Sequence, residues 1–161
     1  MQLLEQGRPA ADRWLRVADA APIPDDVAAL IGLERLAEVP AGRTAPLGVV
    51  VGPATLPEEL APLLNRVALI AVAFPKFRDG RGFTLGRALR ERFRYGGELR
   101  AVGHVLPDQH LFLLRCGFSA VEVADGADLA PWTAALGRFH TAYQAMVTDK
   151  ATLRQCMRRF G

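Results

Sequence analysis

The fold class can be read from VALIAVAF (67–74), an uninterrupted apolar run with the length of a β-strand. It is followed by TLGRALRERFRY (84–95), where apolar residues recur at helical spacing, and then by another apolar run, LRAVG (99–103). Uninterrupted apolar strands that alternate with helices are typical of a parallel sheet whose faces are covered. This stretch therefore predicts an α/β fold.

The same alternation extends in both directions. Upstream, the pattern predicts a strand at LGVVVG (47–52) and a helix at LPEELAPLLNR (56–66). Downstream, it predicts a helix at 107–117, a strand at 119–124 and a last long helix at 128–146. We expect a mostly parallel sheet with alternating helices, either an open sheet or a partial (β/α) barrel, because unit length alone does not choose between them.

The two ends of the chain are less regular. WLRVA (14–18) fits a short strand, and 22–38 is predicted as a helix capped by Asp25 and stopped by Pro40. The basic, weakly patterned tail at 146–161 is expected to be weakly ordered. A length of 161 residues fits a single domain spanning 1–161.

Composition narrows the cellular setting. The first residues carry charges where a signal peptide needs an apolar core, and no apolar run reaches the ~20 residues that span a bilayer. The two cysteines, Cys116 and Cys156, form no CxxC pair, and the three histidines lack metal-ligand spacing. We expect a reduced, cytoplasmic protein that has no metal site and does not contact membranes.

Positive charge is concentrated in one segment. Between Lys76 and Arg100 there are eight basic and three acidic residues, whereas the rest of the chain has a small acidic excess. Seven of the eight are arginine, which suits bidentate contacts with oxyanions. Exposed aromatic residues interleaved with the arginines, or a known docking motif, would be needed for nucleic-acid binding and are not identified. The segment therefore predicts an anion site or a protein contact surface.

The loop FPKFRDGRGF (74–83) lies beyond the carboxyl end of a predicted strand, where α/β folds place their ligands. Its glycines do not match a dinucleotide fingerprint or a Walker loop. Gly80 and Gly82 would allow a tight turn before a helix N-terminus, with Arg81 at its mouth. Arg87 and Arg100 complete the predicted anion site.

Catalytic candidates are Asp79 in this loop and His104 just after the strand at 99–103. Each has a structural alternative. Asp79 can bond the backbone of a turn, and His104 can be an ordinary loop residue. Arg87, Arg90 and Arg94 can belong to a solvated helix face, and Arg100 can pair with Glu98 on the same strand face. Arg92 falls within the apolar arc of the helix, so it must extend to solvent, pair with a carboxylate or face a site.

The block from 74 to 118 resembles an uncharacterised bacterial family, domain of unknown function 934, described as oxidoreductases involved in sulfite reduction. The resemblance rests on three motifs, F-P-x-F-x-D-G-R-G, then R-A-x-G followed by D-Q, then R-x-G-F. They are met here by Phe74, Pro75, Phe77, Asp79, Gly80, Arg81, Gly82, Arg100, Ala101, Gly103, Asp108, Gln109, Arg115, Gly117 and Phe118. His104 stands where the family commonly has an acidic residue.

The resemblance implies a cytoplasmic protein that works with assimilatory sulfite reduction, and it adds Asp108 and Gln109 to the candidate site. The sequence carries no flavin, nicotinamide, haem or iron–sulfur signature, so no cofactor is expected. The first hypothesis is an accessory protein that binds a sulfur oxyanion, sulfite reductase or another sulfur-assimilation protein. The alternative is a small α/β enzyme acting on a phosphorylated or sulfonated metabolite.

Overall fold

Strands and helices alternate through most of the chain in the computed structural model, which describes residues 1–137. The strands are β1 (Gln2–Glu5), β2 (Arg8–Ala10), β3 (Leu15–Arg16), β4 (Ala29–Gly32), β5 (Leu47–Val51), β6 (Leu69–Phe74), β7 (Glu98–Gly103) and β8 (Ala120–Val123). The helices are α1 (Pro57–Leu60), α2 (Arg81–Glu91), α3 (His110–Arg115) and α4 (Ala130–Gly137). Three short 3-10 helices are η1 (Leu33–Glu38), η2 (Ala61–Leu63) and η3 (Pro107–Gln109).

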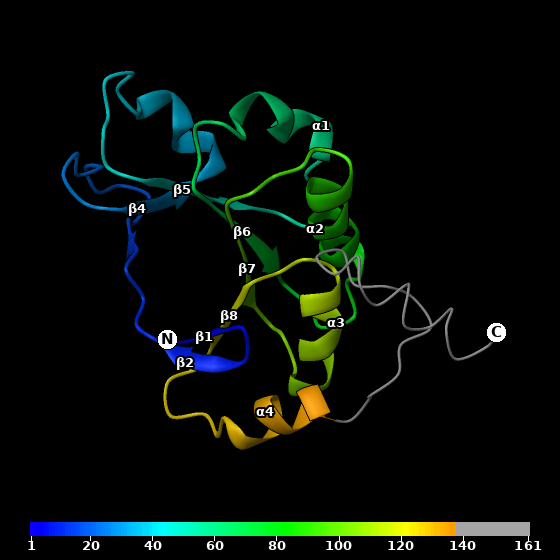
Figure 1. Cartoon of the computed structure of the whole chain (residues 1–161). Helices are drawn as coiled ribbons and strands as arrows, with labels where there is room; N and C mark the ends of the chain where they lie inside the picture. The colour runs from blue at the N-terminus through cyan, green and yellow to red at the C-terminus, as the bar shows by residue number, and fades with distance from the viewer. Residues whose placement is uncertain (138–161) are drawn as a thin grey trace.

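All eight strands belong to one sheet, in the order β2-β1-β8-β7-β6-β5-β4-β3. Strands β3 to β8 are parallel and adjacent in chain order, whereas β1 and β2 are antiparallel additions beside β8. The sheet is mixed, mostly parallel and curled like half of a barrel (Figure 1). The predicted α/β class is therefore confirmed, and the curled form is the one observed.

The predicted strands at 47–52, 67–74, 99–103 and 119–124 correspond to β5, β6, β7 and β8. The predicted helix at 22–38 is wrong, because this region contains strand β4 and the 3-10 helix η1. Residues 29–31 are almost fully buried between β3 and β5, so pairing within the sheet overrides their helix-like spacing. The predicted helix at 128–146 begins as α4, but its second half and the tail at 146–161 lie outside the described residues.

The two faces of the sheet are covered in different ways. Right-handed crossovers between parallel strands laid down in chain order place their helices on one face, and Figure 1 shows α1, α2 and α3 on one side of the sheet. On the opposite, inner face, Trp14, Leu30, Leu69, Ala71 and Val102 form a separate apolar cluster. The segment from residue 11 to 17, here called the crossing segment, runs from β2 through β3 at the far edge of the sheet.

Glycines allow α2 to lie close to β6. The helix begins at Arg81, three residues before the predicted start, so Gly82 belongs to its first turn. A Cβ atom on Gly82 would lie 2.6 Å from the buried ring of Phe74, whereas a Cβ on Gly80 would meet nothing within 4 Å. Gly80 has a φ of −75°, which any residue adopts. Gly82 is therefore needed for the close packing of α2 on β6, whereas a larger residue would fit at position 80.

We predict that Gly82→Ala lowers the free energy of unfolding by about 1–2 kcal/mol, because the overpacking cost exceeds the gain in helix propensity. Gly80→Ala is the matched control and should change it by less than ~0.5 kcal/mol. Urea unfolding followed by circular dichroism measures both. Equal effects of the two substitutions would contradict this account of α2 packing.

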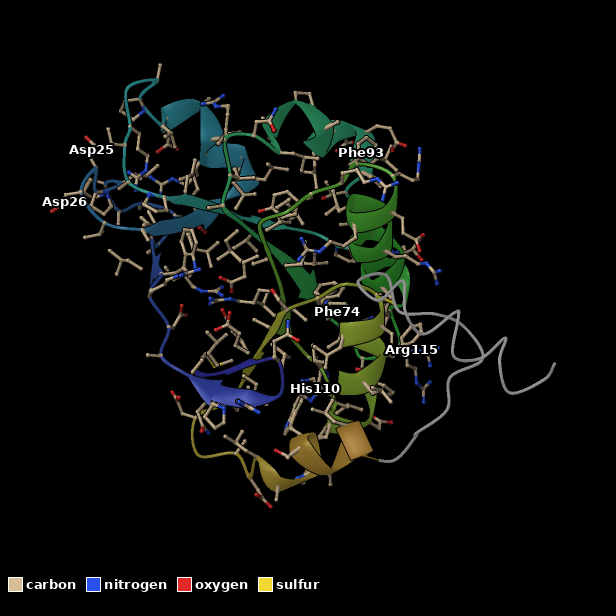
Figure 2. All side chains as sticks on the ribbon, viewed as in Figure 1. Asp25, Asp26, Phe74, Phe93, His110 and Arg115 are labelled. Carbon is tan, nitrogen blue, oxygen red and sulfur yellow. The ribbon has the colours of Figure 1, made fainter. Side chains whose placement is uncertain are left out.

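His110 fixes the position of α4. Its side chain is 2% exposed and its Nδ1–H donates a 2.9 Å hydrogen bond to the carbonyl of Trp132, whose ring also packs against the imidazole. Figure 2 shows His110 among α3, α4 and the β1–β2 hairpin. Burial lowers the pKa of His110, and the hydrogen bond to Trp132 only partly opposes this.

Because the folded protein disfavours the charged imidazole, His110 stabilises the fold fully above the unfolded pKa of about 6.5 and loses this contribution as pH falls below it. We predict that wild-type stability declines between about pH 7 and 5.5, a range chosen to lie above most carboxyl titrations. His110→Gln keeps a donor but does not titrate, so its stability should vary less across this range. Parallel pH curves for the two proteins would rule out His110 as the cause.

Candidate functional site

The loop between β6 and α2 (residues 75–80) carries the centre of the predicted site. Asp79 accepts hydrogen bonds from Arg81 through the backbone N–H (3.2 Å), Nε (2.9 Å) and Nη2 (2.7 Å). These bonds and the guanidinium charge lower the pKa of Asp79 to about 2. The side chain of Arg81 is 63% exposed, but one edge of its guanidinium is already occupied.

Gln109 joins this loop to the segment after β7. Its Nε2 donates a 2.8 Å hydrogen bond to the carbonyl of Phe77, and its Oε1 accepts one of 3.1 Å from the N–H of Leu106. The N–H of His104 donates to the carbonyl of Phe74 at 2.7 Å, and the His104 ring packs edge-on against Phe77, with centroids 5.7 Å apart. The structure thus brings the loop, His104 and Gln109 together at the carboxyl edge of the sheet.

The surface of the loop is both aromatic and cationic. Phe77 is 39% exposed, and the guanidinium of Arg78 lies 5.3 Å from the centre of its ring. Lys76 and Arg78 are exposed, and neither forms an ion pair with any residue that the structure describes. We call Lys76, Phe77 and Arg78 the basic-aromatic loop.

Three arginines on α2 and directly after it, Arg87, Arg90 and Arg92, are bound to other groups of the chain. Arg87 pairs with Glu91 at 3.0 Å, one helical turn away, and remains half-exposed on the outer face. Arg92 pairs with Glu58 at 2.7 Å, so of the three alternatives for this residue the structure shows the carboxylate pair. The third, Arg90, differs from the expected solvated position, because it donates to the carbonyls of Gly117, Tyr95 and Gly97.

Arg100 lies away from the loop, on the inner face of the sheet, where it is 0% exposed. Its guanidinium pairs with Asp12 at 2.8 Å, Glu98 at 2.8 Å and Glu122 at 3.1 Å. The predicted same-face pair with Glu98 is therefore confirmed. The other predicted residue, Asp108, is exposed on η3.

The cluster around Arg100 holds the crossing segment against the inner face. Besides the Asp12 contact, Trp14 Nε1–H donates to Glu98 at 3.1 Å, and Arg16 Nη2 contacts both carboxylate oxygens of Glu122 at 2.9 Å. Burial opposes the charge on Arg100, but hydrogen bonds and attraction from Asp12 and Glu98 outweigh it and raise its pKa. We call this cluster the clasp. It consists of Asp12, Trp14, Arg16, Glu98, Arg100 and Glu122, and the charged group of Arg100 is enclosed by the others.

The sequence reasoning did not identify this clasp. The sequence does indicate that the charges of Glu98 and Arg100 share one face of the sheet, because these residues are two positions apart on a predicted strand. The partner Asp12, however, lies 88 residues away in the chain, so no local pattern could connect it with Arg100. The sequence identifies Lys76 and Arg78 as part of a basic segment, but it does not distinguish them from the arginines that form ion pairs in the structure.

We predict that Arg100→Met lowers the free energy of unfolding by about 3–5 kcal/mol, because it removes the buried cation beside Glu98 and leaves Glu122 with Arg16 alone. Arg13→Met is the control, since Arg13 is 74% exposed and only 3.7 Å from Glu98, and it should cost under ~1 kcal/mol. Chemical unfolding of both variants measures the difference. A small loss for Arg100→Met would mean that the clasp does not stabilise the fold.

Comparison with known proteins places the chain in a family. Residues 48–154 match the model of a bacterial protein family of unknown function, DUF934, so the chain belongs to that family. The match includes Arg100, Glu98, Glu122 and the basic-aromatic loop, whereas the crossing segment precedes it. No curated protein and no solved structure matches the chain.

Two further observations concern residues 1–137. No helix in that range is long and apolar enough to cross a membrane. The same residues contain no group of three or more histidine, cysteine or acidic side chains arranged to hold a metal ion.

Proposed function

We propose that this protein is an accessory protein of assimilatory sulfite reduction, which docks on an acidic surface of sulfite reductase or of another sulfur-assimilation protein. The observation that supports docking is the basic-aromatic loop, where exposed Phe77 is flanked by Lys76 and Arg78, two cations that form no ion pair within residues 1–137. Aromatic and arginine side chains are enriched among the residues that dominate binding energy in protein interfaces. The link to sulfite reduction comes from the motifs between 74 and 118.

The hydrogen bonds of Gln109 favour this role because they hold the loop in place before a partner arrives. The carbonyl of Phe77 is fixed by Gln109, which is itself bonded to Leu106. A loop that is already ordered loses less conformational entropy on binding. Phe77 can therefore act as an anchor, with Lys76 and Arg78 steering an acidic surface toward it.

Direct capture of a sulfur oxyanion is the second possibility, and it is less favoured. Asp79 occupies one edge of the Arg81 guanidinium, Glu91 pairs with Arg87, and three carboxylates enclose Arg100. A small anion would have to compete with these carboxylates or rely on Lys76 and Arg78 alone. An acidic protein surface can engage these two cations while leaving the internal pairs intact.

The enzyme alternative is also less favoured. Asp79, with a pKa of about 2, is a weak base near neutral pH, because efficient general bases have pKa values near the working pH. His104 is exposed and packs against Phe77. A metabolite-transforming enzyme would need one of these groups beside an enclosed anion site.

We predict that Lys76→Glu/Arg78→Glu weakens binding to purified sulfite reductase at least about tenfold, because two attractive charges become repulsive. The control is Arg8→Glu/Arg66→Glu, which makes the same charge change at two exposed positions on other parts of the surface. Biolayer interferometry at two salt concentrations measures binding, and wild-type affinity should fall as salt rises.

The same proteins, titrated calorimetrically with sulfite and sulfate, separate the two modes of the proposal. Reductase binding that is sensitive to Lys76 and Arg78, without measurable anion binding, supports docking. Sulfite binding lost in Arg81→Ala would instead favour oxyanion capture. Reductase binding that is equally weak in both double variants, or absent from the wild type, would overturn the docking proposal.

A further inference from the structure

The inner face of the sheet holds a groove beside the clasp. Two adjoining cavities, of about 510 Å³ and about 380 Å³, share Arg16, Val50 and Ala73 in their lining. Each cavity lies within the ~300–1,000 Å³ range of small-molecule sites. We call the two together the inner groove.

The floor of the inner groove is apolar and lies toward the carboxyl ends of the parallel strands. Leu30, Val50, Ala73 and Val102 come from four adjacent strands, β4 to β7, at positions facing away from the helices. Ligands of parallel α/β sheets and barrels bind at this edge. The position and the floor both fit a small ligand with an apolar body.

The free charge on the walls is negative. The lining includes two residues with a cationic group, Arg16 and the N-terminal Met1. Both groups are already paired: Glu122 contacts Arg16 through both carboxylate oxygens, and Asp125 lies 2.8 Å from the Met1 ammonium. Asp19 and Glu34 line the larger cavity and are exposed, and neither forms an ion pair within the described part of the chain.

Arg35 interacts electrostatically with both Asp19 and Glu34. Its guanidinium, however, is bonded to the carboxylate of Glu38 and to the carbonyls of Ala18 and Ala21. The pair of Arg35 with Glu38 is neutral as a unit, so two acidic charges remain in excess at this end of the groove. An anion would be repelled there, whereas a cation would be attracted.

From the volume, floor and charge together, we propose that the inner groove binds a small organic cation, an amine or guanidinium carried on an apolar body. The apolar body lies on Val50, Ala73 and Val102, and the cationic group lies between Asp19 and Glu34. The lining includes Pro75 but none of the residues of the basic-aromatic loop, which has the opposite charge. The proposal does not depend on the proposed role in sulfite reduction.

The test compares two probes that have the same apolar body and opposite charge, n-hexylamine hydrochloride and sodium hexanoate. Methyl NMR spectra of the full chain are recorded during titration with each. Hexylammonium should shift the methyl signals of Val50, Ala73 and Val102, and hexanoate should bind much more weakly. Shifts that are equal for both probes, or larger with hexanoate, would overturn the proposal, as would no shift with hexylammonium.

Two sets of variants locate the cationic group. Asp19→Asn/Glu34→Gln should weaken hexylammonium binding about tenfold, the combined effect of two partly exposed charges. The matched control, Asp26→Asn/Glu59→Gln, removes one aspartate and one glutamate elsewhere on the surface and should leave binding unchanged; Figure 2 shows Asp26 on an outer loop. Unchanged binding in Asp19→Asn/Glu34→Gln would contradict the assignment.

A steric variant tests the floor without changing charge. Ala73 borders both cavities and is only partly buried, so Ala73→Leu adds volume toward the groove and should abolish hexylammonium binding. Retention of the wild-type backbone spectrum and melting temperature shows that the variant is folded. A folded Ala73→Leu protein that binds hexylammonium as the wild type does would place the ligand outside the inner groove.

Discussion

A buried arginine holds the N-terminal part of this protein to its sheet. Arg100 projects from β7 onto the face that no crossover helix covers, and its charge is balanced by Asp12, Glu98 and Glu122. Asp12 and Trp14 belong to the crossing segment, so the clasp joins β7 to a part of the chain that leads to the opposite edge of the sheet. Burying these charges is costly unless every partner is in place. The clasp therefore favours one position of the crossing segment over others, because any other position would leave buried charges without their partners.

The topology explains why such a clasp is needed. Six parallel strands in chain order send their crossover helices to one face, so none of these crossover helices covers the other. The crossing segment covers part of that face, and the inner groove occupies a region beyond it where Ala73 and Val50 are only partly buried. The basic-aromatic loop begins directly after Pro75, which lines the smaller cavity of the groove, but the two features have opposite free charge and so suit different ligands.

The regular part of the fold could be predicted from sequence because buried parallel strands are continuous apolar runs. β5 and β6 follow this rule, and β7 and β8 were recognised although Glu98, Arg100 and Glu122 interrupt their apolar residues. Gly117, with a φ of +94°, follows the end of α3. Strand β4 could not be recognised because Ala29 to Ile31 are apolar at spacings that fit a helix equally well. The β1–β2 hairpin was not predicted. Its first strand joins the sheet by pairing with β8, more than one hundred residues away, and no local sequence pattern indicates that contact. The composition of the basic segment from Lys76 to Arg100 was readable from the sequence, but the carboxylate partners of Arg81, Arg87, Arg92 and Arg100 could be identified only in the structure.

The most direct test of the clasp is hydrogen–deuterium exchange of the wild type beside Asp12→Ala. Asp12 is 36% exposed, so its loss should leave the fold intact while releasing the crossing segment from Arg100. Peptides covering residues 11–17 should exchange faster in the variant, and peptides from β5 and β6 should be unchanged. Identical exchange of residues 11–17 in the two proteins would show that Arg100 does not hold the crossing segment in place.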